Sequence, residues 1–163
     1  MNEYNDYVQT TRRYLKNYHQ FRITADNMRD DIQFLQQIQD TDISAPISKY
    51  GDQPNGGTPE LNSVESSAER RIAREKEIKE KQISVESIEQ TLRKVDRALN
   101  GLSDSDYNLI HGHYIDGKEW SKIAEEQYIS EKWARERAGK AIRQMAGMIF
   151  GLKANIQLRF NFL

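Results

Sequence analysis

The sequence contains no cysteine among its 163 residues, so neither a disulfide framework nor a thiolate metal site is available to it. Long apolar runs are also missing, and no stretch approaches the roughly 20 consecutive apolar residues that cross a bilayer. We expect no signal peptide, because the first ten residues are polar and acidic. These absences favour a soluble protein of a reducing cytoplasm, with no membrane among its partners.

Proline is scarce, and all three prolines fall within residues 41–62, together with three of the nine glycines. We interpret 41–62 as a loop or linker, since both residue types interrupt regular structure. Over the whole chain, apolar residues make up 37% and charged residues 30%. Such a polar balance suits long helices with wide solvated faces, and the predicted fold class is all-α.

Residues 1–40 predict an N-terminal helical segment. Four aromatic residues follow one another at spacings of seven, four and three, namely Tyr7, Tyr14, Tyr18 and Phe21. These spacings place the four rings on one side of a helix. Such a stripe is typically a packing surface, and its partner is either another helix of this chain or a second subunit.

Residues 63–100 predict a second, long helix that is dense in charge. Its first half alternates charges of opposite sign three and four residues apart, which support an exposed helix. Its second half carries an apolar seam at steps of three and four, formed by Val85, Ile88, Leu92, Val95 and Leu99. A helical hairpin within the chain and a coiled-coil homodimer through the N-terminal helices both fit this seam.

The net charge of −1 is unevenly distributed along the chain. Residues 101–130 carry two Lys/Arg and six Asp/Glu, whereas residues 131–163 carry seven Lys/Arg and two Asp/Glu, a net charge of +5. A local basic surface can bind a polyanion even when the whole chain is nearly neutral. An ordinary solvated helix face is the alternative interpretation of this charge.

Residues 101–150 contain a short predicted helix from Trp120 to about Gln127 and a longer one that starts at Ser130. The Ser130 hydroxyl can cap the first turn of the longer helix. We interpret the pair as a helix-turn-helix, although Tyr128 stands in the turn where a left-handed conformation favours glycine. Small and apolar residues are expected where the helices cross, and the predicted core is Ile123, Ala124, Ile129, Ala134, Ala138 and Ile142.

In a helix-turn-helix, the first turns of the second helix enter the DNA major groove. Lysine and arginine there can pair with guanine, and glutamate can accept from cytosine. The predicted base-reading residues are Glu131, Lys132, Arg135 and Glu136. Flanking side chains suit phosphate contacts that fix orientation, and the predicted set is Lys118, Ser121, Lys122, Arg137, Lys140 and Arg143.

Three other residues were candidates for a role at a site. Trp133 can pack against Arg137 one turn later, lie buried beside the shorter helix, or contact a thymine methyl group, and we expect it to pack within the protein. His111 and His113 lie two residues apart, which sends them to different faces of a helix, so no metal site is expected. No paired carboxylates and no nucleophile with a base stand out, so neither an enzyme nor a cofactor is predicted.

The stretch "LSDSDYNLIHGHYIDGKEWSKIAEEQYISEKWARERAGKAIRQMA", residues 102–146, resembles region four of bacterial sigma factors. There, a short helix ending in Ile-Ala precedes a Ser-capped recognition helix. The wider layout resembles phage transcription regulators of the ArpU and RinA kind. This resemblance implies a DNA-binding activator of late phage genes, acting on double-stranded DNA in the bacterial cytoplasm and contacting host RNA polymerase.

Two further functions fit the same features of the sequence. A small, terminase-like DNA-packaging subunit also joins a helix-turn-helix to helical oligomerisation segments. A protein-interaction module that binds RNA polymerase without touching DNA is the other. The apolar tail at 151–163 alternates like a strand, or docks on a groove, and its role stays open.

Overall fold

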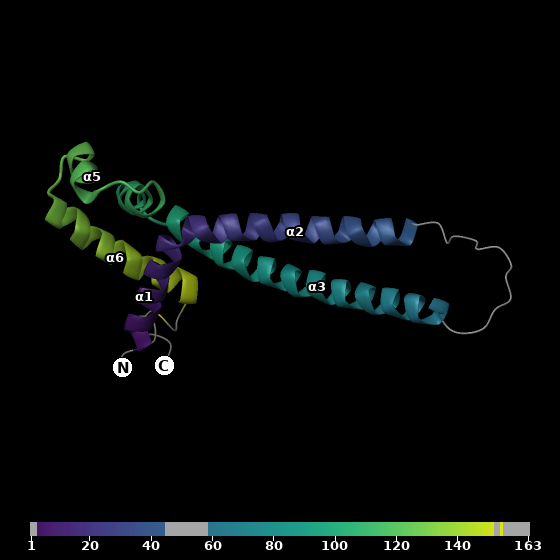
Figure 1. The fold of residues 1–163 in the computed structure, drawn as a ribbon. Coiled ribbons are helices and arrows are strands. Elements are labelled where there is room, and N and C mark those ends of the chain that lie inside the picture. The colour runs from purple at the N-terminus through teal and green to yellow at the C-terminus, as the bar shows by residue number, and fades with distance from the viewer. Residues whose placement is uncertain (1–2, 45–58, 152–153, 155–163) are drawn as a thin grey trace. The chain divides into compact units, whose positions relative to one another are not determined.

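The computed structural model describes residues 3–44, 59–151 and 154. No strand occurs among them, which confirms the predicted all-α fold class. None of the described helices is both long and apolar enough to cross a membrane. In chain order the elements are α1 (Glu3–Lys16), α2 (Tyr18–Ser44), α3 (Pro59–Asn100), α4 (Asp104–Ile110), the π-helix η1 (His111–Ile115), α5 (Trp120–Glu126) and α6 (Glu131–Phe150) (Figure 1).

Two compact units make up the chain, and both α2 and α3 contribute to each of them. One of them, residues 24–87, is called the hairpin unit below. The other joins residues 1–23 to residues 88–163 and is called the compact unit. This division differs from the predicted boundaries at 40, 63 and 101, because it follows packing and cuts through two continuous helices. The predicted strand or docking segment at 151–163 lies outside the described residues, apart from Gly151 and Ala154.

The ends of the first helices also differ from the sequence expectation. The segment predicted as one helix over 1–40 is interrupted at Asn17, although the backbone bonds from Asn17 N to Arg13 O and from Phe21 N to Asn17 O continue across it. Directly after the break, the Tyr18 hydroxyl donates to Asp96 at 2.7 Å. On the other side of the predicted loop, α3 already begins at Pro59, since proline is well tolerated in the first turn of a helix.

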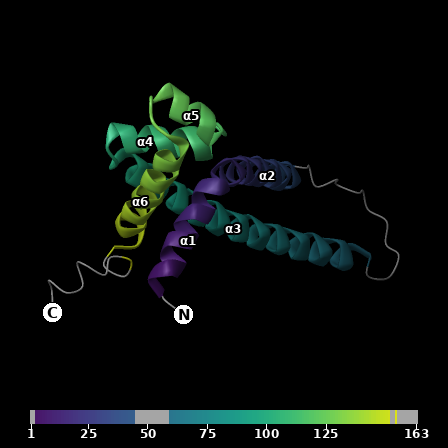
Figure 2. The same cartoon turned by 90° about the vertical axis from the view of Figure 1, so that its left-hand side faces the viewer.

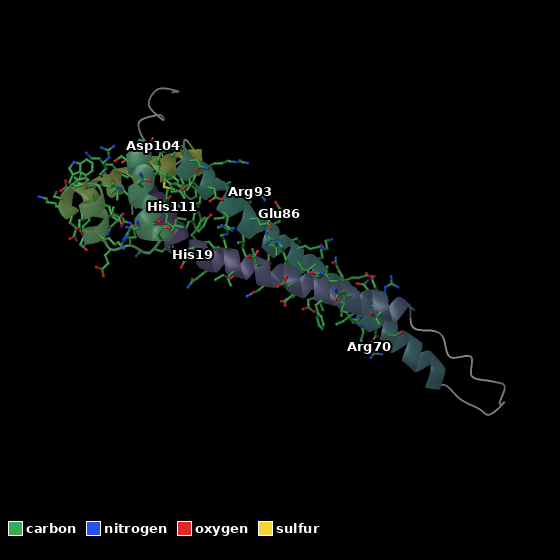
Figure 3. The ribbon with its side chains drawn as sticks, turned by 90° about the horizontal axis from the view of Figure 1, so that it is seen from above. His19, Arg70, Glu86, Arg93, Asp104 and His111 are labelled. Atoms are coloured by element: carbon green, nitrogen blue, oxygen red, sulfur yellow. The ribbon has the colours of Figure 1, made fainter. Side chains whose placement is uncertain are left out.

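In the hairpin unit, parts of α2 and α3 run side by side in opposite directions (Figure 1). Lys81 donates to Asp31 at 2.8 Å and Gln39 donates to Glu75 at 3.0 Å, which fixes the register of the two helices. The buried residues of this pairing are Ala25, Ile78 and Val85. Charged side chains project along both helices, and Figure 3 labels Arg70 and Glu86 among them.

The apolar seam predicted within 63–100 is divided between the two units. Val85 is buried in the hairpin unit, whereas Val95 and Leu99 belong to the core of the compact unit. The charged half of α3 leaves Ile72 and Ile83 exposed, at 66% and 63%. Three residues of the predicted seam are thus buried within this chain, whereas Ile88 and Leu92 stay half-buried.

The compact unit is organised around α6, which contacts α1, α4 and α5 (Figure 2). One face of α6 is completely buried, because small and apolar residues recur on it at helical spacing. The residues of this face are Ala134, Ala138, Ala141, Ile142, Met145 and Ala146. The helix that carries the candidate site is thus held along most of its length.

The part of the aromatic stripe that lies on α1 packs within the chain. The rings of Tyr7 and Tyr14 lie 4.9 Å and 6.2 Å from the ring of Phe150, at the end of α6. Leu15 and Thr11 on the same helix are fully buried, and the Thr11 hydroxyl donates to the Tyr7 carbonyl at 2.9 Å. Of the two partners that the sequence left open, α6 of the same chain is the one that the structure provides.

Leu15→Ala is expected to lower the free energy of unfolding by about 2–5 kcal/mol, because it opens a cavity at a fully buried position. Ile83→Ala removes a similar apolar side chain from an exposed position and is expected to change stability by less than about 0.5 kcal/mol. Urea unfolding followed by circular dichroism measures both. Equal losses in the two variants would contradict the packing of α1 in the core.

Candidate nucleic-acid interface

The turn between α5 and α6 is fixed by two backbone hydrogen bonds. Ile129 N donates to Ala124 O at 2.9 Å, and Tyr128 N donates to Glu125 O at 3.2 Å. These bonds correspond to the two closures of a Schellman motif, which satisfies the last carbonyls of a helix. The motif brings half-buried Ile129 back over the end of α5, where it packs on the core that includes Ile123.

Tyr128 occupies the left-handed position of this motif, with φ of 56°, and is the one non-glycine residue with positive φ in the described part of the chain. Glycine takes that conformation freely, as Gly117 does with φ of 70° after η1. A side chain with a Cβ atom pays roughly 1–2 kcal/mol for it. Because Tyr128 is also 96% exposed, no packing within the described residues compensates for this strain.

The start of α6 is fixed by its cap and by a close crossing with α5. The Ser130 hydroxyl oxygen accepts from Trp133 N at 3.2 Å, which satisfies one of the free N–H groups of the first turn. Ala134 is fully buried, and Ile123 and Ala124 on α5 are almost so. The small side chain of Ala134 permits this crossing, since a longer one there would push the two helices apart.

η1 and the loop after it hold α5 from the other side. The His113 ring stacks on Trp120 with centroids 4.0 Å apart, and its Nδ1 lies 2.9 Å from the Lys118 carbonyl. Gly112 is buried, and a Cβ atom there would lie 3.4 Å from the Ile123 side chain. His111 stacks on Tyr107 with ring centroids 5.1 Å apart, and its Nδ1 lies 3.3 Å from the Asp116 carboxylate. Among the described residues, no group of three acidic or histidine side chains could hold a metal ion.

One side of α6 faces away from the core and carries charged side chains. Lys132, Glu136, Lys140 and Arg143 follow one another at steps of four, four and three, and all four are exposed. Lys132, Lys140 and Arg143 form no ion pair with any residue that the structure describes. On α5, Ser121 and Lys122 are exposed as well.

The other two predicted base-reading residues contact each other. Arg135 forms an ion pair with Glu131 one turn earlier on α6. Its guanidinium carbon also lies 5.8 Å from the centre of the Trp120 ring. Both side chains stay more than two-fifths exposed, so each can leave the other for a new partner.

Two predicted phosphate contacts are already bound within the protein. Lys118 donates to Glu126 at 2.8 Å, and Arg137 donates to Asp106 on α4 at 2.6 Å. Burial opposes ionisation of Asp106, but hydrogen bonds from Arg137 and Ser103 outweigh it, so the pKa of this carboxyl is lowered. These two cations thus stabilise the fold around α5 and α6 rather than projecting freely like Lys140.

Trp133 is 40% exposed in the first turn of α6, so it is not buried beside α5. The Arg137 guanidinium carbon lies 5.0 Å from the centre of its ring. An open hollow of about 220 Å³ lies beside the ring, with Lys140 and Gln144 among its walls. Placement against Arg137 one turn later is one of the three positions that the sequence suggested for Trp133.

Comparison of the chain with protein-family models, with curated proteins and with solved structures found no match.

Tyr128→Gly is expected to raise the free energy of unfolding by up to about 1 kcal/mol, because glycine adopts positive φ without steric cost. The neighbouring Gln127→Gly is the matched control, and it is expected to lower stability because Gln127 has φ of −102°. Thermal unfolding of both variants compares the two positions. A loss of stability in Tyr128→Gly as large as in Gln127→Gly would refute the strain at Tyr128.

Asp106→Asn is expected to lower the free energy of unfolding by about 1 kcal/mol at pH 7, because the charge partner of Arg137 is lost. Since the pKa of Asp106 is lowered by folding, its contribution is present above the unfolded value of about 4 and disappears as the pH falls through the folded value. As the pH falls below 4, the free energy of unfolding should therefore decrease less in Asp106→Asn than in the wild type. Asp104→Asn removes an exposed acid from the same turn of α4 and serves as the control in acid unfolding.

Proposed function

We propose that this chain binds double-stranded DNA sequence-specifically, with the first turns of α6 in the major groove. The observation that carries the proposal is the exposed face of α6, on which Lys132, Lys140 and Arg143 are free of ion pairs with described residues. Unpaired cations aligned on a rigid helix suit a polyanion, because their charges are already positioned and need no intramolecular partner to be displaced.

The length of this face assigns different roles to its two ends. Residues 132 and 143 are separated by about 16 Å along the helix axis, at about 1.5 Å per residue. The major groove is roughly 12 Å wide, so both ends cannot lie over base edges at once. Lys132 and Glu136 in the first turns are the base contacts of the proposal, and Lys140 and Arg143 contact phosphates.

The remaining predicted contacts have graded roles in this proposal. Arg135 must break its ion pair with Glu131 before it can contact a base. Its contribution to affinity is therefore smaller than that of an unpaired cation. Ser121 and Lys122 reach phosphates from α5, because both are exposed there. Arg137 and Lys118 act through the protein, since their ion pairs with Asp106 and Glu126 hold α4, α5 and α6 in place.

The resemblance of residues 102–146 to sigma factor region four extends the proposal to transcription. In this form the protein is a regulator, an activator of phage late genes, that acts in the bacterial cytoplasm and contacts host RNA polymerase. The long, charged hairpin unit supports this extension, because it offers an extensive polar surface that DNA recognition by α6 does not use. Self-association through the N-terminal helices is the alternative use of this surface.

The test is selection of binding sites from a random duplex library at near-physiological salt, followed by titration of the recovered site by fluorescence anisotropy. Lys132→Ala is expected to reduce discrimination between the selected site and its base variants by about 1–3 kcal/mol. Lys140→Ala should weaken binding to all duplexes alike. It should also make the negative slope of log affinity against log salt less steep by about 0.9.

Lys79→Ala is the matched control, because it removes an exposed lysine from α3 and should change neither quantity. Recovery of no sequence from the library by a folded protein would contradict the proposal and favour an interaction module that binds protein alone. Light scattering separates the remaining alternative, since a packaging subunit assembles into a ring, whereas a monomer or dimer excludes it.

A further inference from the structure

Trp133 is a large apolar side chain on the cationic side of α6. It is the third residue of the helix, and 40% of it is exposed where the neighbouring turns carry Lys132, Glu136 and Lys140. Tryptophan is enriched among the residues that anchor binding interfaces. The face that carries the proposed function therefore has an apolar centre as well as charge.

The indole ring is held in place before any partner arrives. Arg137 covers it from 5.0 Å, and Asp106 anchors Arg137 at 2.6 Å. Asp106 is itself held by Ser103, whose hydroxyl donates to its carboxylate at 2.8 Å. The backbone of Trp133 is fixed by the cap of Ser130. A side chain positioned in this way loses little conformational entropy when it binds.

The surroundings of Trp133 restrict the chemistry of its partner. The hollow beside the ring is lined by the cations Arg137 and Lys140 and by the amide of Gln144, with Glu136 the one acid besides Asp106. An apolar group flanked by negative charge fits this environment. In the DNA major groove, the 5-methyl group of thymine is the apolar feature of the base edges, and phosphates run on either side of it.

We propose that Trp133 reads thymine, through contact of its exposed indole edge with the 5-methyl group, and that Arg137 and Asp106 position the ring for this contact. The inference rests on the proposed function, because it requires α6 in the major groove. It makes Trp133 a specificity-determining residue of that interface and Arg137 a positioning residue. The bases at the selected site are then read by one apolar contact in addition to the polar ones.

The experiment replaces each thymine of the selected duplex, one at a time, by deoxyuridine, which lacks only the 5-methyl group. Wild-type protein is expected to lose about fourfold in affinity at one or two positions, the value of one buried methyl group. Trp133→Ala should bind thymine and uracil duplexes equally at those positions. Arg137→Ala should show a reduced difference, since the ring is no longer held.

Ile83→Ala is the control, because it removes an exposed apolar side chain from the hairpin unit and should keep the full preference for thymine. Thermal unfolding checks that each variant is folded. If Trp133→Ala is unfolded, Trp133→Gln replaces it and is expected to bind thymine and uracil duplexes equally. Wild-type indifference to every uracil, an unchanged preference in the Trp133 variant, or a selected site without thymine overturns the inference. Each of these leaves sequence-specific binding intact, whereas recovery of no site defeats the proposed function itself.

Discussion

The compact unit depends on the burial of one face of α6 among three other helices. Ala134, Ala138 and Ala141 are small side chains that permit a close approach of neighbouring helices, and the larger Met145 is fully buried further along α6. The packing is demanding because a buried helix face accepts neither larger side chains nor unpaired polar groups. Once this face is fixed, the direction of every other side chain on α6 follows from the helical repeat, so the core determines which residues can meet a ligand.

The sequence was sufficient to predict the all-α class and most helix ends after residue 100, because those ends depend on local chemistry. Ser130 caps α6 in the structure as its hydroxyl suggests, and the turn at Tyr128 has the left-handed conformation that its place implies. Burial of Ile123 and Ala134 likewise follows from periodicity alone. Such features need only a few neighbouring residues to be specified.

What sequence reasoning could not supply were contacts between residues far apart in the chain. Tyr18 donates to Asp96 on α3, and Arg137, which lies over the Trp133 ring, donates to Asp106 on α4. Helical spacing assigns a residue to a face, but it does not say which faces meet. For the same reason, the base-reading and phosphate-contacting assignments stay predictions, and the structure supports some of the side chains in those roles better than others.

The compact unit is built from two stretches separated by the 64 residues of the hairpin unit, which makes the hairpin an insertion in the chain. Bringing the two stretches together from an open chain costs about 4 kcal/mol of loop-closure entropy for an insertion of this length. A hairpin whose helices pair early brings its own ends together and removes much of that cost before the core forms. We therefore expect that shortening the hairpin in register preserves this closure, whereas replacing it with a long unstructured linker slows assembly of the helices around α6.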